Sequence, residues 1–299
     1  MRNTSLIAIV LAVVLCSSWL GIVFYPSPQD FMRSNPSWNG LKDFSHRTHA
    51  DMVTSLNKVE PGTECVLLTI PYLQYNDNDL QKVTDFVQGG GTLLVMDDYG
   101  YGNQVLEALG LGMRFDGKPM LDPYLCYRNE KLPIVTDLAP YIQDVGVKSL
   151  ILNHATALTI SGPGQILARS SNSAYIDQNE NLSWDAGEPQ GPFVIAAKAA
   201  LGQGTVIAVA DPSILINSMD DRADNEAFVD ELIAVAGETP KIYVDTVHLP
   251  KETLDHAKDF WETAKERMSN PYGLVLLVGG ILALTVVPFW RKGAKVGRK

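Results

Sequence analysis

The chain has 299 residues, enough for two membrane spans and one sizeable domain. Six of its 24 basic residues flank the outer ends of two apolar segments, which leaves 18 basic against 34 acidic residues between them, a balance of −16. Such a surface repels phosphate backbones, so the charge argues against nucleic acid as a partner.

The first apolar segment, from Leu6 to Tyr25, contains no charged side chain. As a helix it would span roughly 30 Å, the thickness of the hydrocarbon core of a bilayer. A cleaved signal peptide is the alternative, but the residues from Trp19 to Tyr25 offer no small-residue cleavage site. We therefore interpret residues 1–25 as an uncleaved N-terminal transmembrane anchor.

The second apolar segment, from Gly273 to Trp290, is uncharged and has aromatic residues at both edges, as interfacial anchors do. The tail over 291–299 contains five positive charges and no acid. Because basic flanks stay in the cytoplasm, both termini are expected there and the central domain outside. The chain is thus predicted to be a two-pass protein of the cell membrane, and its uncharged spans give no evident path for a transported ion.

Between the spans, apolar runs alternate with helical patterns, which predicts an α/β domain over 41–240. We expect a mostly parallel sheet with helices on both faces, preceded by a linker over 26–40 and followed by a juxtamembrane stalk over 241–272. The predicted elements of the first half are a helix over 41–59, a strand over 64–70, a helix from Asn78 or Asp79 to Gln88, a strand over 92–96 and a helix over 104–109. Those of the second half are strands over 150–160, 165–169, 193–200 and 205–210 and a helix over 224–236 with Phe228, Leu232 and Val235 as its buried stripe.

The predicted stalk carries apolar residues at alternating spacings of three and four, a short seam of the coiled-coil type. The members of this seam are Leu254, Ala257, Trp261, Ala264 and Met268. The seam either packs on its own domain or meets a partner.

Two motifs resemble a known family. One runs from Phe86 to Asn103 and contains three consecutive glycines and the pair Asp97-Asp98, and the other runs from Gly204 to Ser213. Together they resemble the membrane-anchored domain-of-unknown-function 4350 family over roughly residues 30 to 237. The resemblance implies a flavodoxin-like sheet related to class I glutamine amidotransferase domains, with no established activity. It also implies an association with MoxR-type ATPase systems.

An amidotransferase needs a nucleophilic Cys on a tight turn after a strand, with a base nearby. The turn after the predicted strand over 92–96 is Asp97-Asp98-Tyr99-Gly100, which has no thiol. We therefore expect that this catalysis is absent.

Acidic side chains occupy the predicted strand ends instead, namely Asp97, Asp98 and Asp211. Ligands of open α/β sheets bind beyond the carboxyl ends of the strands. With Asn103 and Asn217, these acids are candidates for a cation or polyol site. The alternative, favoured by how commonly Asp serves as a cap, is that the acids cap helix N-termini and fix the turns.

A second candidate site lies between residues 177 and 188. Ca²⁺ prefers about six to eight oxygen ligands, which a loop supplies at alternate positions. In order, the candidate ligands are Asp177, Asn179, Asn181, the backbone carbonyl of Ser183, Asp185 and Glu188. The pattern resembles an EF-hand or dockerin loop, but Leu182 stands where such loops have Gly. The alternatives are a polar hairpin loop without an ion and, at Asn181, a glycosylation acceptor.

Cysteine and histidine add little chemistry. Cys65 and Cys126 either form a disulfide or remain free thiols. His46 and His49 stand three residues apart, but two ligands are too few for Zn²⁺. We therefore interpret them as surface histidines.

The sequence therefore predicts a membrane-tethered extracytoplasmic domain that binds or scaffolds without catalysis, alongside a membrane or envelope protein partner. The alternative is an extracytoplasmic hydrolase or carbohydrate-processing enzyme that uses the strand-end acids, because paired carboxylates support acid–base catalysis when one pKa is raised. Acids that cap helices would favour the scaffold, and acids that line a closed cleft would favour the enzyme.

Overall fold

The computed structural model describes residues 10, 13–14, 17–22 and 24–269, with side chains up to residue 261. The chain forms two compact units, one of residues 1–25 and 251–299 and one of residues 26–250. The predicted second span and the basic tail lie outside the described residues, as do parts of the first span. Within the described ranges, no helix has both the length and the apolar character that crossing a bilayer requires.

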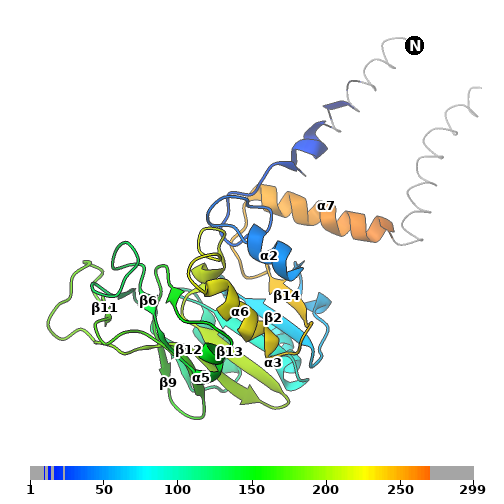
Figure 1. Ribbon diagram of the computed structural model, residues 1–299. Coiled ribbons are helices and arrows are strands. Elements are labelled where there is room, and N and C mark those ends of the chain that lie inside the picture. The colour runs from blue at the N-terminus through cyan, green and yellow to red at the C-terminus, as the bar shows by residue number, and fades with distance from the viewer. Residues whose placement is uncertain (1–9, 11–12, 15–16, 23, 270–299) are drawn as a thin grey trace, which may run out of the picture. The chain divides into compact units, whose positions relative to one another are not determined.

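The unit over 26–250 is built on a ten-stranded mixed sheet (Figure 1). Its parallel strands are, in spatial order, β1 (Asp51–Val53), β14 (Lys241–Asp245), β2 (Cys65–Thr69), β3 (Thr92–Met96) and β13 (Gly204–Val209). Antiparallel strands extend the sheet beyond β13, namely β12 (Val194–Leu201), β10 (Gln165–Arg169), β7 (Asp137–Leu138), β9 (Leu158–Ile160) and β4 (Met113–Phe115). The architecture is therefore α/β with a mostly parallel central sheet, as predicted.

The parallel strands are apolar because both of their faces are covered. All five residues of β3 are buried, and successive side chains enter different cores because strand side chains alternate. Leu94 and Met96 belong to one core, and Leu93 and Val95 to the other. A short apolar run without polar alternation is thus the sequence pattern of a strand buried on both sides.

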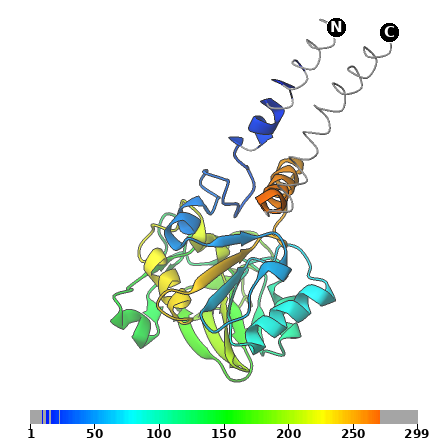
Figure 2. The ribbon, with the colours of Figure 1, turned by 90° about the vertical axis from the view of Figure 1, so that its right-hand side faces the viewer.

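Helices cover both faces of the sheet. Helices α3 (Asp77–Gln88) and α4 (Gly102–Ala108) contribute side chains to the core of Leu93. Helices α2 (Lys42–Thr48) and α6 (Asn225–Ala234) contribute to the core of Leu94. Figure 2 shows α3 and α6 on opposite sides of the strands.

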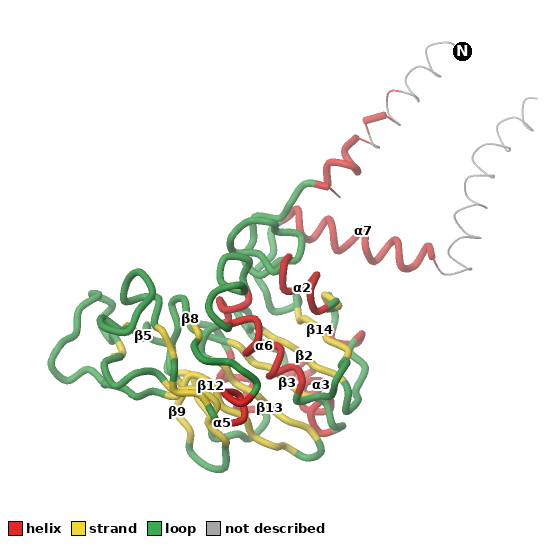
Figure 3. Tube along the Cα trace, viewed as in Figure 1, coloured by secondary structure: helices red, strands yellow, loops and turns green. Residues whose placement is uncertain are grey.

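Long loops join the smaller elements (Figure 3). These elements are β5 (Met120–Leu121), β6 (Ile134–Val135), β8 (Leu150–Ile151), β11 (Tyr175–Ile176), α5 (Pro140–Asp144) and the single-turn helices η1 (Leu56–Lys58) and η2 (Pro212–Leu215). Helix α7 (Thr253–Ser269) belongs to the other unit.

The helix predicted over 41–59 is wrong beyond Thr48. Helix α2 ends there because His49 adopts a left-handed conformation, with φ of 53°. Residues 51–53 then extend and pair with β14 as an edge strand. Local periodicity does not reveal this strand, because its partner lies far along the chain.

Residues 241–250, which the sequence analysis assigned to the stalk, belong to the sheet unit instead. Strand β14 lies between β1 and β2, and the stalk helix begins only at Thr253. The predicted linker over 26–40 is likewise packed, because Phe31, Met32 and Asn35 are buried.

Three smaller predictions need correction. The strand expected over 150–160 is two separate strands, β8 and β9. Helix α3 is capped by Asn76, whose Oδ1 accepts from the Asp79 N–H at 3.0 Å, rather than by Asn78 or Asp79. Val235 follows the end of α6 and is exposed, and Val229 and Ile233 of α6 join Phe228 and Leu232 in the core.

We expect Gly204→Ala to destabilise the domain by about 1–3 kcal/mol, the usual cost of overpacking. A Cβ atom at Gly204, where β13 begins, would overlap the backbone carbonyl oxygens of Val87 and Gly91. Urea denaturation of the segment 26–250 measures the change. The control is Gly164→Ala, whose Cβ would meet its nearest neighbour at 3.4 Å, and an equal loss in both variants would contradict the packing argument.

Candidate functional site

The three strand-end acids of the prediction lie together. Asp97 and Asp98 follow β3 directly, and Asp211 follows the adjacent parallel strand β13, whose Val209 pairs with Met96. All three are buried, with 2 %, 5 % and 0 % of their surface exposed. The parallel register thus brings the acids to one edge of the sheet, where ligands of α/β proteins usually bind.

Asp97 and Asp211 use both carboxylate oxygens to bind backbone. Asp97 accepts from the N–H groups of Gly100 at 2.8 Å and of Gly102, the first residue of α4, at 2.6 Å. Asp211 accepts from the N–H of Asn153 at 2.6 Å and from that of Ser213, in η2, at 2.8 Å. Both acids therefore fix turns and helix starts, as the alternative interpretation proposed.

Asp98 has a different environment. Its Oδ1 accepts from the Tyr72 hydroxyl at 2.9 Å and from the Tyr99 N–H at 2.6 Å. The Tyr99 hydroxyl in turn donates to the backbone carbonyl of His154 at 2.7 Å. Both oxygens of Asp97 and of Asp211 accept from backbone N–H groups, whereas Asp98 accepts from a tyrosine hydroxyl, so Asp98 is the best candidate for chemistry at this edge.

Burial shifts the protonation of this cluster. It raises the pKa of Asp97 to about 6, although the N–H groups of Gly102 and Gly100 oppose the shift. It also raises the pKa of Asp98 and, well above the usual range, that of Asp211, to which the charge of Asp98 contributes. Burial and then Asp98 raise the pKa of Tyr72. Carboxyls of this kind could act as general acids if a substrate reached them.

Asn103 and Asn217 do not join the acids. Asn103 ties α4 to β4, because its amide donates to the Phe115 carbonyl at 2.9 Å and its Oδ1 accepts from the Phe115 N–H at 2.8 Å. Asn217 fixes the N-terminal arm through Asp43 and Ser37. Both side chains are structural in this fold.

A second polar cluster, which the sequence analysis missed, is buried at the ends of β2 and β14. Asp245 Oδ2 accepts from the Tyr75 hydroxyl at 2.7 Å and from Thr69 Oγ1 at 3.1 Å, and it lies 2.6 Å from His248 Nδ1. The rings of Tyr75 and His248 stack at 3.4 Å between centroids, and Asp79 Oδ2 lies 3.8 Å from His248 Nε2. The signal available in the sequence was the apolar run of β14 followed by an acid, the same pattern as in β3.

The loop over 177–188 is held in shape by hydrogen bonds among its own residues. Asp177, which is fully buried, accepts from the N–H groups of Asn181 at 3.1 Å and of Leu182 at 2.8 Å. Asp185 Oδ2 accepts from the amide groups of Asn179 and Asn181 at 2.7 and 2.8 Å. The first, third, fifth and ninth candidate ligands are therefore joined to one another.

The last ligand closes the loop. Glu188 accepts from the N–H groups of Gln178 at 2.8 Å and of Asp185 at 3.0 Å. Leu182, at the position where calcium loops have Gly, adopts the left-handed conformation that Gly would favour, with φ of 63°. The departure from the sequence pattern therefore does not remove the sharp turn.

Other metal and redox sites are not evident in the part of the chain that the structure describes. There, no group of three or more His, Cys, Asp and Glu side chains is arranged to hold a metal ion. This holds also for Asp177, Asp185 and Glu188, the three carboxylates of the predicted calcium loop. Cys65 and Cys126 are free thiols, which settles the disulfide alternative.

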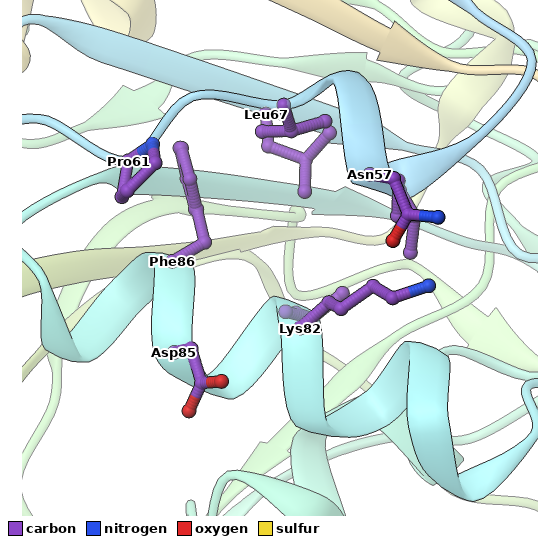
Figure 4. Close-up of a pocket in the computed structure, with 9 residues that line it drawn as sticks. Asn57, Pro61, Leu67, Lys82, Asp85 and Phe86 are labelled. Carbon is purple, nitrogen blue, oxygen red and sulfur yellow. The ribbon is translucent and has the colours of Figure 1, made fainter.

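Two surface pockets lie away from the strand-end acids. One, of about 230 Å³, lies between α3 and the segment before β2, with Leu67 and Phe86 in its wall and Lys82 across its mouth (Figure 4). The other, of about 720 Å³, is lined by Arg47 and Asp220 among others. Neither pocket includes Asp97, Asp98 or Asp211.

We expect the pH dependence of stability to report the state of Asp97. The pKa of its carboxyl rises from 3.8 to about 6 on folding, so the protonated form stabilises the folded state. This contribution is complete below about pH 4 and is lost as the pH rises through about 6. This difference in pKa corresponds to a loss on the order of 3 kcal/mol.

The variant Asp97→Asn cannot ionise at this position. Its unfolding free energy, measured by urea denaturation of the segment 26–250, should fall less than that of the wild type between about pH 4 and pH 7. Asp85→Asn replaces an exposed acid and should retain the wild-type slope. Identical slopes in all three proteins would refute the assignment.

Comparison with known proteins defines the family. A family model described as a domain of unknown function (DUF4350) matches residues 33–233. Among solved structures, the N-terminal domain of mmIFT52 is similar at 13% identity and a TM-score of 0.45, over 60% of this chain and 83% of that one. A β-galactosidase from Bacillus circulans sp. alkalophilus is similar at 12% identity and a TM-score of 0.34, over 56% of this chain and 22% of that one.

An exo-β-1,4-mannosidase from an Opitutaceae bacterium is similar at 12% identity and a TM-score of 0.33, over 59% of this chain and 26% of that one. This chain thus spans about a quarter or less of the length of these two glycosidases. No curated protein matches the sequence. Because the family model covers more than half of its residues, the chain belongs to the DUF4350 family.

Proposed function

We propose that this chain is a membrane-tethered domain outside the cytoplasm that binds or scaffolds envelope proteins without catalysis and is stabilised by calcium. The observation that carries the proposal is the use of the strand-end acids. Asp97 gives both oxygens to backbone N–H groups of the turn that follows it, and Asp211 gives one to the following turn and one to the N–H of Asn153. A carboxylate committed in this way supports structure and is poorly placed to transfer a proton to a substrate.

The tether and its direction rest on the sequence. Two uncharged apolar segments of bilayer length and a cationic tail place the domain outside the cytoplasm under the positive-inside rule. The free thiols of Cys65 and Cys126 are compatible with either side of the membrane. The lipid bilayer is thus one partner, and an envelope protein is the other.

The loop over 122–130, here called the tyrosine loop, supports the binding role. Tyr124 is 86% exposed, and Tyr127 and Arg128 are also exposed. Asp122 holds the loop in shape, because its Oδ1 accepts from the N–H groups of Tyr124 and Leu125 at 3.1 and 2.9 Å. Tyr and Arg on a preorganised loop are the residue types that dominate binding energy in protein interfaces.

Calcium would stabilise the loop over 177–188. Asp185 is exposed, and its Oδ2 accepts from the side-chain amides of Asn179 and Asn181. A calcium ion at the centre of the loop would replace these two hydrogen bonds with a stronger interaction with the carboxylate. One such site stabilises by mass action, about 2.7 kcal/mol when free ion is a hundredfold above Kd. A structural role fits a single loop between two strands better than a sensor role does.

A second function, that of an extracytoplasmic hydrolase or carbohydrate-processing enzyme, is favoured by one observation. Burial raises the pKa of Asp98 beside a tyrosine hydroxyl, which is the environment of a general acid. In that case Asp98→Asn would abolish turnover of an envelope polymer while the fold persists. The backbone bonds of Asp97 and Asp211 favour the scaffold.

Calcium binding has a direct test. At about 1 mM Ca²⁺, the affinity range of extracellular calcium modules, we expect the melting temperature of the segment 26–250 to rise. Asp185→Asn keeps the size of the side chain but removes its charge, so the rise should be lost. Glu180→Gln is the matched control, because Glu180 lies in the same loop but pairs with Lys118 at 2.8 Å and is not a predicted ligand. Equal responses in both variants would exclude this site.

The binding role is tested by purifying the full chain from membranes of its source organism in mild detergent. We expect an envelope protein to co-purify, and Tyr124→Ser with Tyr127→Ser to reduce its recovery at least about tenfold, as loss of hot-spot residues does. Val145→Ser with Val235→Ser replaces exposed apolar residues elsewhere and should leave recovery unchanged. Absence of any partner, or equal recovery with all variants, would contradict a binding role for this loop.

A further inference from the structure

Helix α7 has an apolar side that its own unit covers only in part. Leu254, Ala257 and Trp261 form the described part of the predicted seam and are half-buried. Phe260, at the edge of this seam, is 65% exposed. His256 and Asp259 lie on the opposite side, where His256 is exposed and Asp259 is half-buried, whereas Asp255 is buried. The helix is therefore amphipathic, with aromatic residues on its apolar side.

The apolar side of α7 contacts the first apolar segment of the chain. The rings of Trp261 and Trp19 meet edge to face, with 6.2 Å between centroids and 75° between planes. Lys258 Nζ donates to the backbone carbonyl of Tyr25 at 2.5 Å. All four residues belong to the same compact unit.

These contacts set the level of α7 relative to the predicted span. Tyr25 is the outer end of that span, and Trp19 precedes it by six residues, which is about 9 Å of helix. Interfacial helices bury their apolar side roughly 5–10 Å into the boundary between headgroups and acyl chains. Trp and Tyr are enriched at this same level of membrane proteins.

We infer that α7 lies in the outer interface of the bilayer, with Leu254, Ala257, Phe260 and Trp261 in contact with lipid, instead of standing as a stalk in water. The inference rests on the proposed membrane tether. The occupant of this side is lipid at the headgroup–acyl boundary. Acids and bases both occur among residues 255–259, so the attraction does not require anionic headgroups.

The experiment uses the full chain in phosphatidylcholine vesicles, with Cys16, Cys65 and Cys126 replaced by Ala. Single cysteines at positions 254 to 261 carry nitroxide labels, and collision with oxygen is compared with collision with a water-soluble nickel chelate. The oxygen-to-nickel ratio should oscillate with a period of about 3.6 residues. It should be several-fold higher at 254, 257 and 261 than at 256 and 259, the matched controls on the same helix.

Two outcomes would overturn the interfacial helix. A uniformly low ratio would place α7 in water, and exclusion of both reagents from the apolar side would mean that protein covers it. Alkaline carbonate extraction tests the tether separately. Release of the chain would overturn the tether itself, whereas a chain that stays in the membrane with a water-exposed α7 would overturn only the helix assignment.

Discussion

The fold depends on hydrogen bonds between aspartates at strand ends and the backbone of the turns that follow. A strand buried on both faces leads into a turn that little water can reach, and its N–H groups need acceptors there. Asp97, Asp122 and Asp177 each follow a strand directly and accept from two N–H groups of the next turn. Asp211 and Asp245 accept from the N–H groups of Ser213 and Val247 two residues on. Part of the acidic composition therefore consists of buried aspartates that stabilise the turns.

This constraint explains why the strand-end cluster resembles an active site. Raised pKa values at the carboxyl edge of a sheet are a common sign of catalysis, but buried structural groups produce the same sign. Here burial raises the pKa of Asp97 while two backbone N–H groups oppose the shift. The groups that the carboxylate oxygens bind distinguish a catalytic acid from a structural acid better than the pKa does. By that criterion Asp98, which accepts from the Tyr72 hydroxyl, differs from Asp97, whose oxygens both bind the turn that follows it.

The elements that could be predicted from the sequence are those that a local residue pattern determines. The strands over 92–96 and 165–169 have the predicted bounds, and the hairpin at residues 201–204 joins the predicted pair. Strand β14 and edge strand β1 were not predicted, because each is defined by pairing with a distant segment. The acids at the strand ends were identified, but which groups their oxygens bind depends on the turn geometry. The hydrogen bonds of Asn103 and Asn217 to Phe115 and Asp43 could not be predicted for the same reason, since these partners come from tertiary structure.

The proposed contacts of the chain with lipid and with protein use aromatic side chains, whereas its solvated surface is acidic. A domain with a balance of −16 is repelled by anionic lipid, so charge cannot hold it at a membrane. The groups proposed to meet lipid are Phe260 and Trp261, and those proposed to meet protein are Tyr124 and Tyr127. Aromatic side chains of this kind bind through buried area, which salt does not screen, whereas contacts between exposed charges weaken as ionic strength rises. In the proposed function, the acidic surface then disfavours anionic partners, and the exposed aromatic residues provide the contacts.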